Sequence, residues 1–200
     1  MSSRTSEVRR KTKETEIAVR LDLEGGPVAL DVPNGFFAHM LDALAKHSGL
    51  GLEITTSGDT EIDLHHTVED VGLALGEALD EALGDRRGVR RFAHAYAPLD
   101  ESLARAVVDL SGRGFFSFSA PSEIERSWVT AEFPLTLLGD FFQALANRAR
   151  LTLHLHLLEA RNPHHAVEAA FKAVALALRQ AVSIHEGEDE VPSTKGTLSE

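Results

Sequence analysis

Two copies of a histidine–carboxylate pattern are the residues of this sequence best suited to chemistry. They read His65-His66-Thr67-Val68-Glu69-Asp70 and His164-His165-Ala166-Val167-Glu168-Ala169. In a helix, the first histidine and the glutamate of each copy lie four positions apart and share a face, so they can bind one metal ion. The second histidine is rotated by about 100° and points elsewhere. Each copy therefore offers ligands to two metal ions, and two facing copies could build a paired site.

Both copies lie where a helix is expected to begin. Asp63 and Asn162 precede the histidine pairs by two residues, and both are favourable N-cap types. Pro163 follows at the first helical position, where proline is tolerated because its missing N–H would have no helical partner. A single histidine near a helix N-terminus is usually a capped, solvated residue. Two copies with the same cap favour a metal or catalytic site.

The composition limits the kind of site. The chain has 200 residues, 43% of them hydrophobic, with ten histidines and no cysteine. Thiolate metal sites are excluded, which leaves histidine and carboxylate as ligands. The formal charge of −11 argues against nucleic acid or an anionic membrane as a general partner, and no apolar run is long enough to span a bilayer. The polar N-terminus is unlike a signal peptide, so we expect a cytoplasmic protein.

The elements that must position these residues recur along the chain. Residues 1–10 read as a loose arm. Alternation and helical spacing predict, in the first half, strands over 17–23 and 50–55, a returning strand over 28–32, and helices over 36–47 and from Asp63 to near Gly84. In the second half they predict strands over 103–110, 115–118 and 151–158, and helices over 137–149 and from Asn162 to near Ile184.

The two halves also match residue by residue. Asp22 corresponds to Asp109, residues 36–54 to residues 137–155, and residues 63–66 to residues 162–165. This pattern predicts an α/β (α+β) fold made by tandem duplication of a ββαβα-like half-domain. Burial of the apolar faces favours two sheets enclosing a helical layer. We expect half-domains over 1–95 and 96–186 and a substrate-covering tail over 187–200, within a single compact enzyme domain.

Six ordered motifs resemble the imidazoleglycerol-phosphate dehydratase family over almost the whole chain. Beside the two histidine motifs, they are Phe37-Ala38-His39-Met40-Leu41, Pro98-Leu99-Asp100-Glu101, Asp109-Leu110-Ser111-Gly112-Arg113 and Pro192-Ser193-Thr194-Lys195-Gly196. The resemblance implies a lyase of histidine biosynthesis that dehydrates D-erythro-imidazole glycerol phosphate to imidazole acetol phosphate. It also implies two Mn²⁺ per active site and a homo-oligomer, a hollow 24-mer with sites between subunits.

The resemblance further implies roles for individual residues. One metal ion would be held by His39, His66, His164 and Glu168, and the other by His65, Glu69, His165 and the residue at 140. Glu14 matches the family's acid–base residue, although by itself it reads as an exposed charge at the start of a strand. The positions that match substrate or phosphate contacts are Arg91, Arg113, Lys172, Ser193 and Lys195.

The sequence departs from the family pattern at two positions. Ala38 stands where an aspartate is usual, and Asp140 stands where a histidine is usual. We expect Asp140 to be a shorter metal ligand; alternatively, water or His154 takes its place. A two-metal phosphoesterase is the alternative function, and a metal storage cage is a third possibility that leaves Arg91 and Arg113 unexplained.

Overall fold

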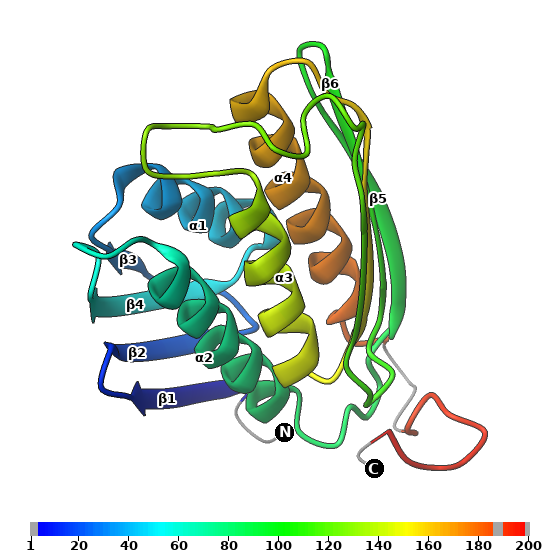
Figure 1. Ribbon diagram of the computed structural model, residues 1–200. Helices are drawn as coiled ribbons and strands as arrows, with labels where there is room; N and C mark the ends of the chain where they lie inside the picture. The colour runs from blue at the N-terminus through cyan, green and yellow to red at the C-terminus, as the bar shows by residue number, and fades with distance from the viewer. Residues whose placement is uncertain (1–3, 186–189, 199–200) are drawn as a thin grey trace.

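The computed structural model describes residues 4–185 and 190–198 and is built of two similar halves, each with one four-stranded sheet (Figure 1). The first half contains β1 (Thr5–Lys11), β2 (Thr15–Asp22), β3 (Val28–Asp31), α1 (Gly35–Ser48), β4 (Gly51–Gly58) and α2 (His65–Leu83). The second half contains β5 (Phe92–Leu99), β6 (Ser102–Asp109), β7 (Phe115–Ser119), α3 (Thr136–Arg148), β8 (Thr152–Glu159) and α4 (Pro163–Ala181). The predicted duplication and the α+β architecture are confirmed.

Both sheets have the same topology, with strand orders β1-β2-β4-β3 and β5-β6-β8-β7. β2 pairs antiparallel with both β1 and β4, whereas β3 pairs parallel with β4. β3 therefore runs antiparallel to β2, as expected of a returning strand, but it pairs with β4 and not with β2. Both edges of β2 are already occupied, so β3 lies at the far edge of the sheet.

Each half has one strand more than the ββαβα pattern. The interpretation of residues 1–10 as a loose arm is wrong, because β1 pairs with β2 over seven residues. In the second half β5 pairs with β6 in the same way. The change from one sheet to the other falls between α2 and β5, so the expected half-domain boundary after residue 95 lies within β5.

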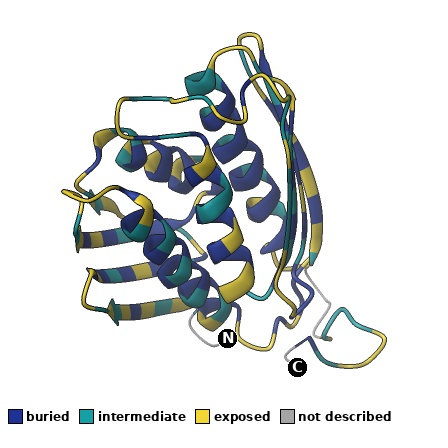
Figure 2. Cartoon of the chain, in the orientation of Figure 1, coloured by how far each residue is buried: buried dark blue, intermediate teal, exposed yellow. Residues whose placement is uncertain are grey.

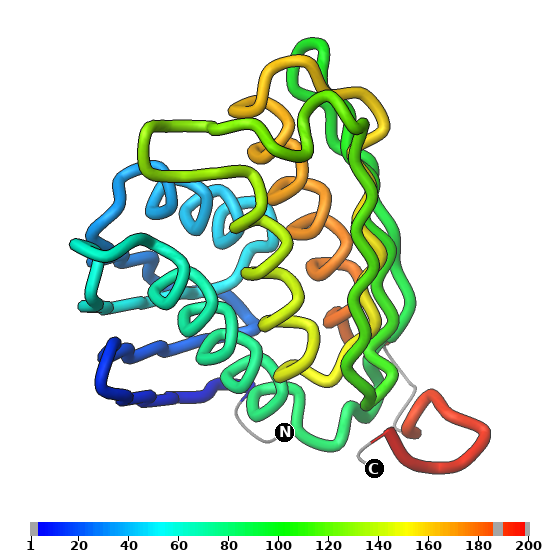
Figure 3. Tube along the Cα trace, viewed as in Figure 1, coloured from blue at the N-terminus to red at the C-terminus, as the bar shows by residue number. Residues whose placement is uncertain are grey.

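The helices form a layer between the two sheets (Figures 1 and 3). Alternate residues of each sheet face this layer and are buried, as Ile17, Val19 and Leu21 are in β2. Figure 2 shows the same alternation along the strands, with the buried positions continuing into the helices. One hydrophobic core therefore joins the two halves. In the part of the chain that the structure describes, no helix is long and apolar enough to cross a bilayer.

The helices pair across the duplication, α1 with α4 and α2 with α3. Two glycines of α2 make the second pairing close. A Cβ atom on Gly72 would lie 2.6 Å from the carbonyl oxygen of Phe141, and one on Gly76 would lie 2.5 Å from that of Leu145. Because each pair takes one helix from each half, residues distant in sequence meet at the starts of α2 and α4.

Candidate metal centre

The two histidine motifs open α2 and α4 in similar ways. The Asn162 side chain is the N-cap of α4 and accepts a hydrogen bond of 3.0 Å from the His164 N–H. Asp63 accepts a 2.7 Å bond from the His65 N–H, but the N-cap of α2 is Leu64, one residue later than expected. The expected i, i+4 pairs form in both helices. His65 Nε2 lies 3.6 Å from Glu69 Oε2, and the equivalent distance from His164 to Glu168 is 3.5 Å.

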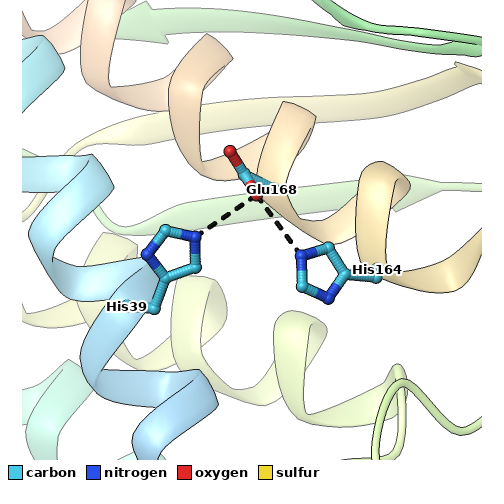
Figure 4. Close-up of side chains that lie close together, drawn as sticks. All are labelled: His39, His164 and Glu168. Atoms are coloured by element: carbon cyan, nitrogen blue, oxygen red, sulfur yellow. Dashed lines mark hydrogen bonds and ion pairs between the residues drawn. The ribbon is translucent and has the colours of Figure 1, made fainter.

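His39, His164 and Glu168 form a compact group between α1 and α4 (Figure 4). One oxygen of Glu168, Oε2, lies 3.4 Å from His39 Nε2 and 3.5 Å from His164 Nε2. One ligand atom from each residue lies within 4.8 Å of the other two. This arrangement suits a single divalent ion held by two imidazole nitrogens and one carboxylate oxygen.

Lys172 completes this group on the next turn of α4. Its Nζ lies 2.6 Å from Glu168 Oε1, the carboxylate oxygen that does not face the histidines. Partial burial raises the pKa of Glu168, but the hydrogen bond and the charge of Lys172 outweigh this effect and lower it below its usual value. Glu168 is therefore held as an anion, with one oxygen bound to a cation and the other directed at His39 and His164.

His65, Glu69 and Asp140 lie together between α2 and α3, but in a different arrangement. Glu69 faces Nε2 of His65, whereas Asp140 Oδ2 lies 3.4 Å from Nδ1 of the same ring. The two ring nitrogens point in different directions, so these carboxylates do not converge on one ligand atom. His154, the other candidate for this place, projects from the outer face of β8, the face opposite the helices.

The second histidine of each motif has a carboxylate partner that belongs to neither group. His66 Nδ1 lies 3.1 Å from Asp59 Oδ2, and His165 Nδ1 lies 3.0 Å from Glu101 Oε2. The hydrogen bond to Asp59 raises the pKa of His66. The bond that His165 donates lowers the pKa of Glu101 to about 2. One chain thus brings together three of the four residues expected for each metal ion, and His66 and His165 are the missing members.

Glu14 lies close to His66, in the turn between β1 and β2. Its Oε2 atom is 3.8 Å from His66 Nδ1, and 54% of its side chain is exposed. The backbone of this turn is fixed: the Glu14 N–H donates to Thr12 Oγ1, and the Glu14 carbonyl accepts from the Asp59 N–H. An exposed carboxylate on a fixed backbone is well placed to exchange protons with a bound molecule.

Among the described residues, most of the expected substrate-binding residues contact neither histidine group. Arg91 donates to Asp109 at 2.7 Å and to the Pro192 carbonyl at 2.6 Å. This second bond fixes the described part of the C-terminal segment, which carries Ser193 and Lys195, beside the start of β5 (Figure 3). Arg113 lies in the turn before β7, and its guanidinium approaches the Ser111 carbonyl. Lys172 alone is next to a histidine group. The expected tail over 187–200 lies partly outside the described residues.

Sequence reasoning missed the carboxylates that contact His66 and His165. Asp59 read only as part of a turn after a strand, and Glu101 belonged to a motif without an assigned role. Sequence reasoning also gave no role to buried Asp70, which accepts hydrogen bonds from Thr15 and Arg10 and so holds the strands beside Glu14. The repeat offered a signal for Glu101, because that residue corresponds to Glu14.

Comparison with known proteins gives one consistent result. Residues 33–178 match the family model described as imidazoleglycerol-phosphate dehydratase. The chain is 52% identical over 200 residues to a protein of that name from Halorhodospira halophila, with 99% of this chain and 100% of the relative covered. It is 48% identical to another from Anaeromyxobacter sp. (strain K), with 98% and 93% covered.

Solved structures agree with the sequence comparison. The imidazoleglycerol-phosphate dehydratase of Staphylococcus aureus superposes with a TM-score of 0.80 at 35% identity, covering 90% of this chain and 99% of that chain. The structure of IGPD from Pyrococcus furiosus superposes with a TM-score of 0.82 at 37% identity, covering 96% of this chain and 100% of that one. The similarity therefore extends over both halves of the duplication.

Proposed function

The chain belongs to the imidazoleglycerol-phosphate dehydratase family, and we propose that its copies build active sites shared between chains, each holding two Mn²⁺. Family membership confirms the predicted function, a hydro-lyase of histidine biosynthesis that converts imidazole glycerol phosphate to imidazole acetol phosphate and water. The phosphoesterase alternative is not favoured, because relatives covering nearly the full chain are named as dehydratases.

The observation that carries the metal proposal is the compact group of His39, His164 and Glu168. Three donors on one side of a site leave room for a further protein ligand and for substrate in an octahedral shell. His66 from another copy is the proposed fourth ligand. For the second ion we propose His65, Glu69, Asp140 and the His165 of another copy. Ligation by Asp140 requires its carboxylate to move from the Nδ1 side of His65 to the Nε2 side.

The distribution of residues along α4 supports sites shared between chains. His164 lies in the first turn of α4, whereas the Arg91 N–H donates to the carbonyl of Ala181, the last residue of that helix. A helix of 19 residues is about 28 Å long. A small phosphate ester held at His164 cannot reach Arg91 of the same chain. An arginine from a neighbouring copy is needed to complete the site.

The outer face of the second sheet supports association of the chains. Phe92, Tyr96 and Phe115 project from it with 57%, 51% and 53% of their surface exposed. Exposed aromatic side chains on both edge strands of a water-facing sheet indicate a contact surface. We propose a homo-oligomer, in its final form a 24-mer. We also propose a cytoplasmic location without nucleic-acid partners, in line with a charged phosphate ester as substrate and a net charge of −11.

The proposed chemistry divides between the metal ions and the side chains. Bound metal ions would supply Lewis-acid and template chemistry at the imidazole ring of the substrate. The hydroxyl on the carbon attached to the ring leaves, and Glu14 takes the proton from the next carbon and returns it to that hydroxyl, which departs as water. The resulting enol tautomerises to the ketone of the product. The residues that bind the phosphate and orient the substrate are Arg91, Arg113, Lys172, Ser193 and Lys195, since cations and hydroxyl donors match its oxygens.

The metal proposal is tested by removing and replacing the ions. Protein stripped with a chelator should lose dehydratase activity and regain it with Mn²⁺ at two ions per chain. Zn²⁺ and Mg²⁺ serve as comparisons, because imidazole ligands favour transition metals and oxygen ligands favour Mg²⁺. Full activity of the stripped protein would contradict the proposal.

Shared sites are tested by mixing two inactive variants. His164→Ala removes a ligand from one part of the site, and Arg91→Ala removes a phosphate contact from another part. If the parts come from different chains, mixed oligomers contain some sites assembled from two undamaged parts, and activity returns in part. Each variant taken alone through the same dissociation and reassembly is the control. No recovery in mixtures that do exchange chains would place each site within one chain.

A further inference from the structure

The second histidine of each motif is bound on the same ring nitrogen by a carboxylate. His66 Nδ1 contacts Asp59, and His165 Nδ1 contacts Glu101. An ionised carboxylate only accepts hydrogen bonds, so the proton of each neutral ring lies on Nδ1 and the lone pair lies on Nε2. Among the described residues, Nε2 of neither ring has a hydrogen-bond or ion-pair partner. Each ring is thus oriented with a free Nε2 that can bind a metal ion.

The two carboxylates come from different places in the duplicated fold. β2 starts at Thr15 and β6 at Ser102, so Glu14 and Glu101 are the equivalent residues just before these strands. β4 ends at Gly58 and β8 at Glu159, so the equivalent of Asp59 is Ala160. The side chain of alanine has no hydrogen-bond acceptor. In the second half the contact with histidine is therefore made by the counterpart of Glu14.

The choice of Asp59 as the partner of His66 has a consequence for Glu14. Asp59 occupies His66 Nδ1 at 3.1 Å, and Glu14 stays 3.8 Å away, beyond hydrogen-bond distance. Asp59 also donates its own N–H to the Glu14 carbonyl at 3.1 Å. One residue thus fixes the ring through its side chain and fixes the backbone of Glu14 through its amide. The Glu14 carboxylate is left 54% exposed.

We propose that Asp59 and Glu101 are positioning residues that direct Nε2 of His66 and His165 toward the metal ions. We further propose that Asp59 makes the histidine contact in place of Glu14, and so leaves that carboxylate available as the acid–base group. This inference rests on the proposed metal ligands. In such arrangements the outer carboxylate fixes the tautomer and orientation of the ligand histidine, and its loss typically weakens metal binding by about 10–100-fold.

The test compares Asp59→Ala with Glu101→Ala. Glu101→Ala should raise the dissociation constant for Mn²⁺ by about 10–100-fold, measured by competition with a chelator. Asp59→Ala should raise it by less, because Glu14 can take over the contact with His66. The two variants should differ in kcat once Mn²⁺ is saturating. Glu101→Ala should regain a kcat near that of the parent, because only metal affinity is affected. Asp59→Ala should not, because Glu14 becomes the nearest carboxylate to His66 Nδ1 and is drawn into that contact. Glu61→Ala, an exposed carboxylate of the same loop, is the matched control.

A spectroscopic measurement separates positioning from a general loss of structure. Magic-angle-spinning NMR of metal-free protein with ¹⁵N-labelled histidine reports which ring nitrogen carries the proton. The Nδ1–H signal of His165, identified by its loss in His165→Ala, should weaken in Glu101→Ala. The Nδ1–H signal of His66, identified by its loss in His66→Ala, should weaken in the double variant Asp59→Ala/Glu14→Ala, in which both nearby carboxylates are removed. Asp59→Asn keeps the size and an acceptor oxygen, so it should retain most of the Nδ1–H form even if the alanine variant folds poorly.

Three further outcomes decide between the proposals. If His66→Ala and His165→Ala bind Mn²⁺ as tightly as the parent, the proposed metal ligands are wrong. If these variants lose metal while Glu101→Ala and the double variant Asp59→Ala/Glu14→Ala keep the parent's dissociation constant and tautomers, the positioning inference alone is overturned. Equal recovery of kcat by both carboxylate variants at saturating Mn²⁺ would overturn the claim about Glu14.

Discussion

The groups at the starts of α4 and α2 descend from the same repeat but differ in arrangement and charge. At α4, His39 and His164 face one oxygen of Glu168, and Lys172 binds the other oxygen. At α2, His65 lies between the carboxylates of Glu69 and Asp140. Position 140 corresponds to His39, and Leu73 stands where Lys172 is expected from the repeat. One group thus pairs a carboxylate with a cation, and the other holds two carboxylates and no lysine.

The difference indicates a division of labour within one fold. In the α4 group, Lys172 keeps Glu168 ionised and adds a positive charge that can receive an anionic substrate. In the α2 group, two carboxylates provide a stronger attraction for a cation but offer nothing to a phosphate. Glu168 is also more enclosed, with 14% of its side chain exposed compared with 47% for Glu69. We therefore infer that the α4 group is the more specialised for substrate.

The largest expected effect is loss of the compact group. His164→Ala removes one of the two nitrogens that face Glu168 and should reduce both the affinity for this ion and dehydratase activity by more than about 100-fold, since a direct ligand matters more than its outer partners. His65→Ala makes the same change in the α2 group and should remove the second ion while sparing the first. The measurement is metal per chain after dialysis, with activity in parallel. Two Mn²⁺ per chain in His164→Ala would refute the assignment of this ligand.

The sequence predicts the parts of this comparison that depend on local spacing. The pairs His65–Glu69 and His164–Glu168 follow from helical periodicity alone. The contacts that make the two groups different, such as Asp140 with His65, depend on how closely α2 and α3 pack. That packing is permitted by Gly72 and Gly76, whose role is visible only in three dimensions.

The two strands missed by sequence reasoning have a physical reason in common. Only Val8 is buried in β1, which otherwise consists of polar and charged residues on the edge of a sheet. In β5 the buried residues are Ala93, Ala95 and Ala97, while Phe92 and Tyr96 face outward. Strand prediction that looks for large apolar residues pointing into the core therefore misses both strands. The proposed contact with another chain would account for the outward aromatic residues.

An intermediate effect is expected from exchanging the lysine between the two groups. Lys172→Met removes a positive charge from the α4 group, so the KM for substrate should rise by about 10-fold or more, as for loss of a hydrogen bond between charged groups. Mn²⁺ should bind no more weakly, because the lysine no longer repels the ion. The pKa of Glu168 should rise in the metal-free protein, because the cation that lowers it is gone. Carboxylate ¹³C NMR measures that change.

Two variants serve as controls for the lysine exchange. Lys172→Arg keeps the charge and should stay close to the parent in the pKa of Glu168. Leu73→Lys places a lysine four residues after Glu69 and should weaken metal binding in the α2 group without improving KM. If Lys172→Met leaves KM unchanged, Lys172 serves only to hold Glu168, and the proposed contact with substrate is wrong.

The smallest effect is expected from making the two groups alike at position 140. Asp140→His restores the residue type found at the equivalent His39, on a helix already packed against α2. An imidazole reaches further than the aspartate carboxylate and supplies a nitrogen donor, which first-row transition metals favour. We expect the variant to fold normally, to lose Mn²⁺ to a chelator up to about 10-fold more slowly, and to keep or raise the parent rate. Asp140→Ala is the decisive control. If it matches the parent in metal retention and rate, then Asp140 is not a ligand. Its contact with His65 Nδ1 would then be no more than an ion pair between neighbouring helices. If instead Asp140→Ala loses the second ion and Asp140→His keeps it, the α2 group has retained its ligand position with a shorter side chain.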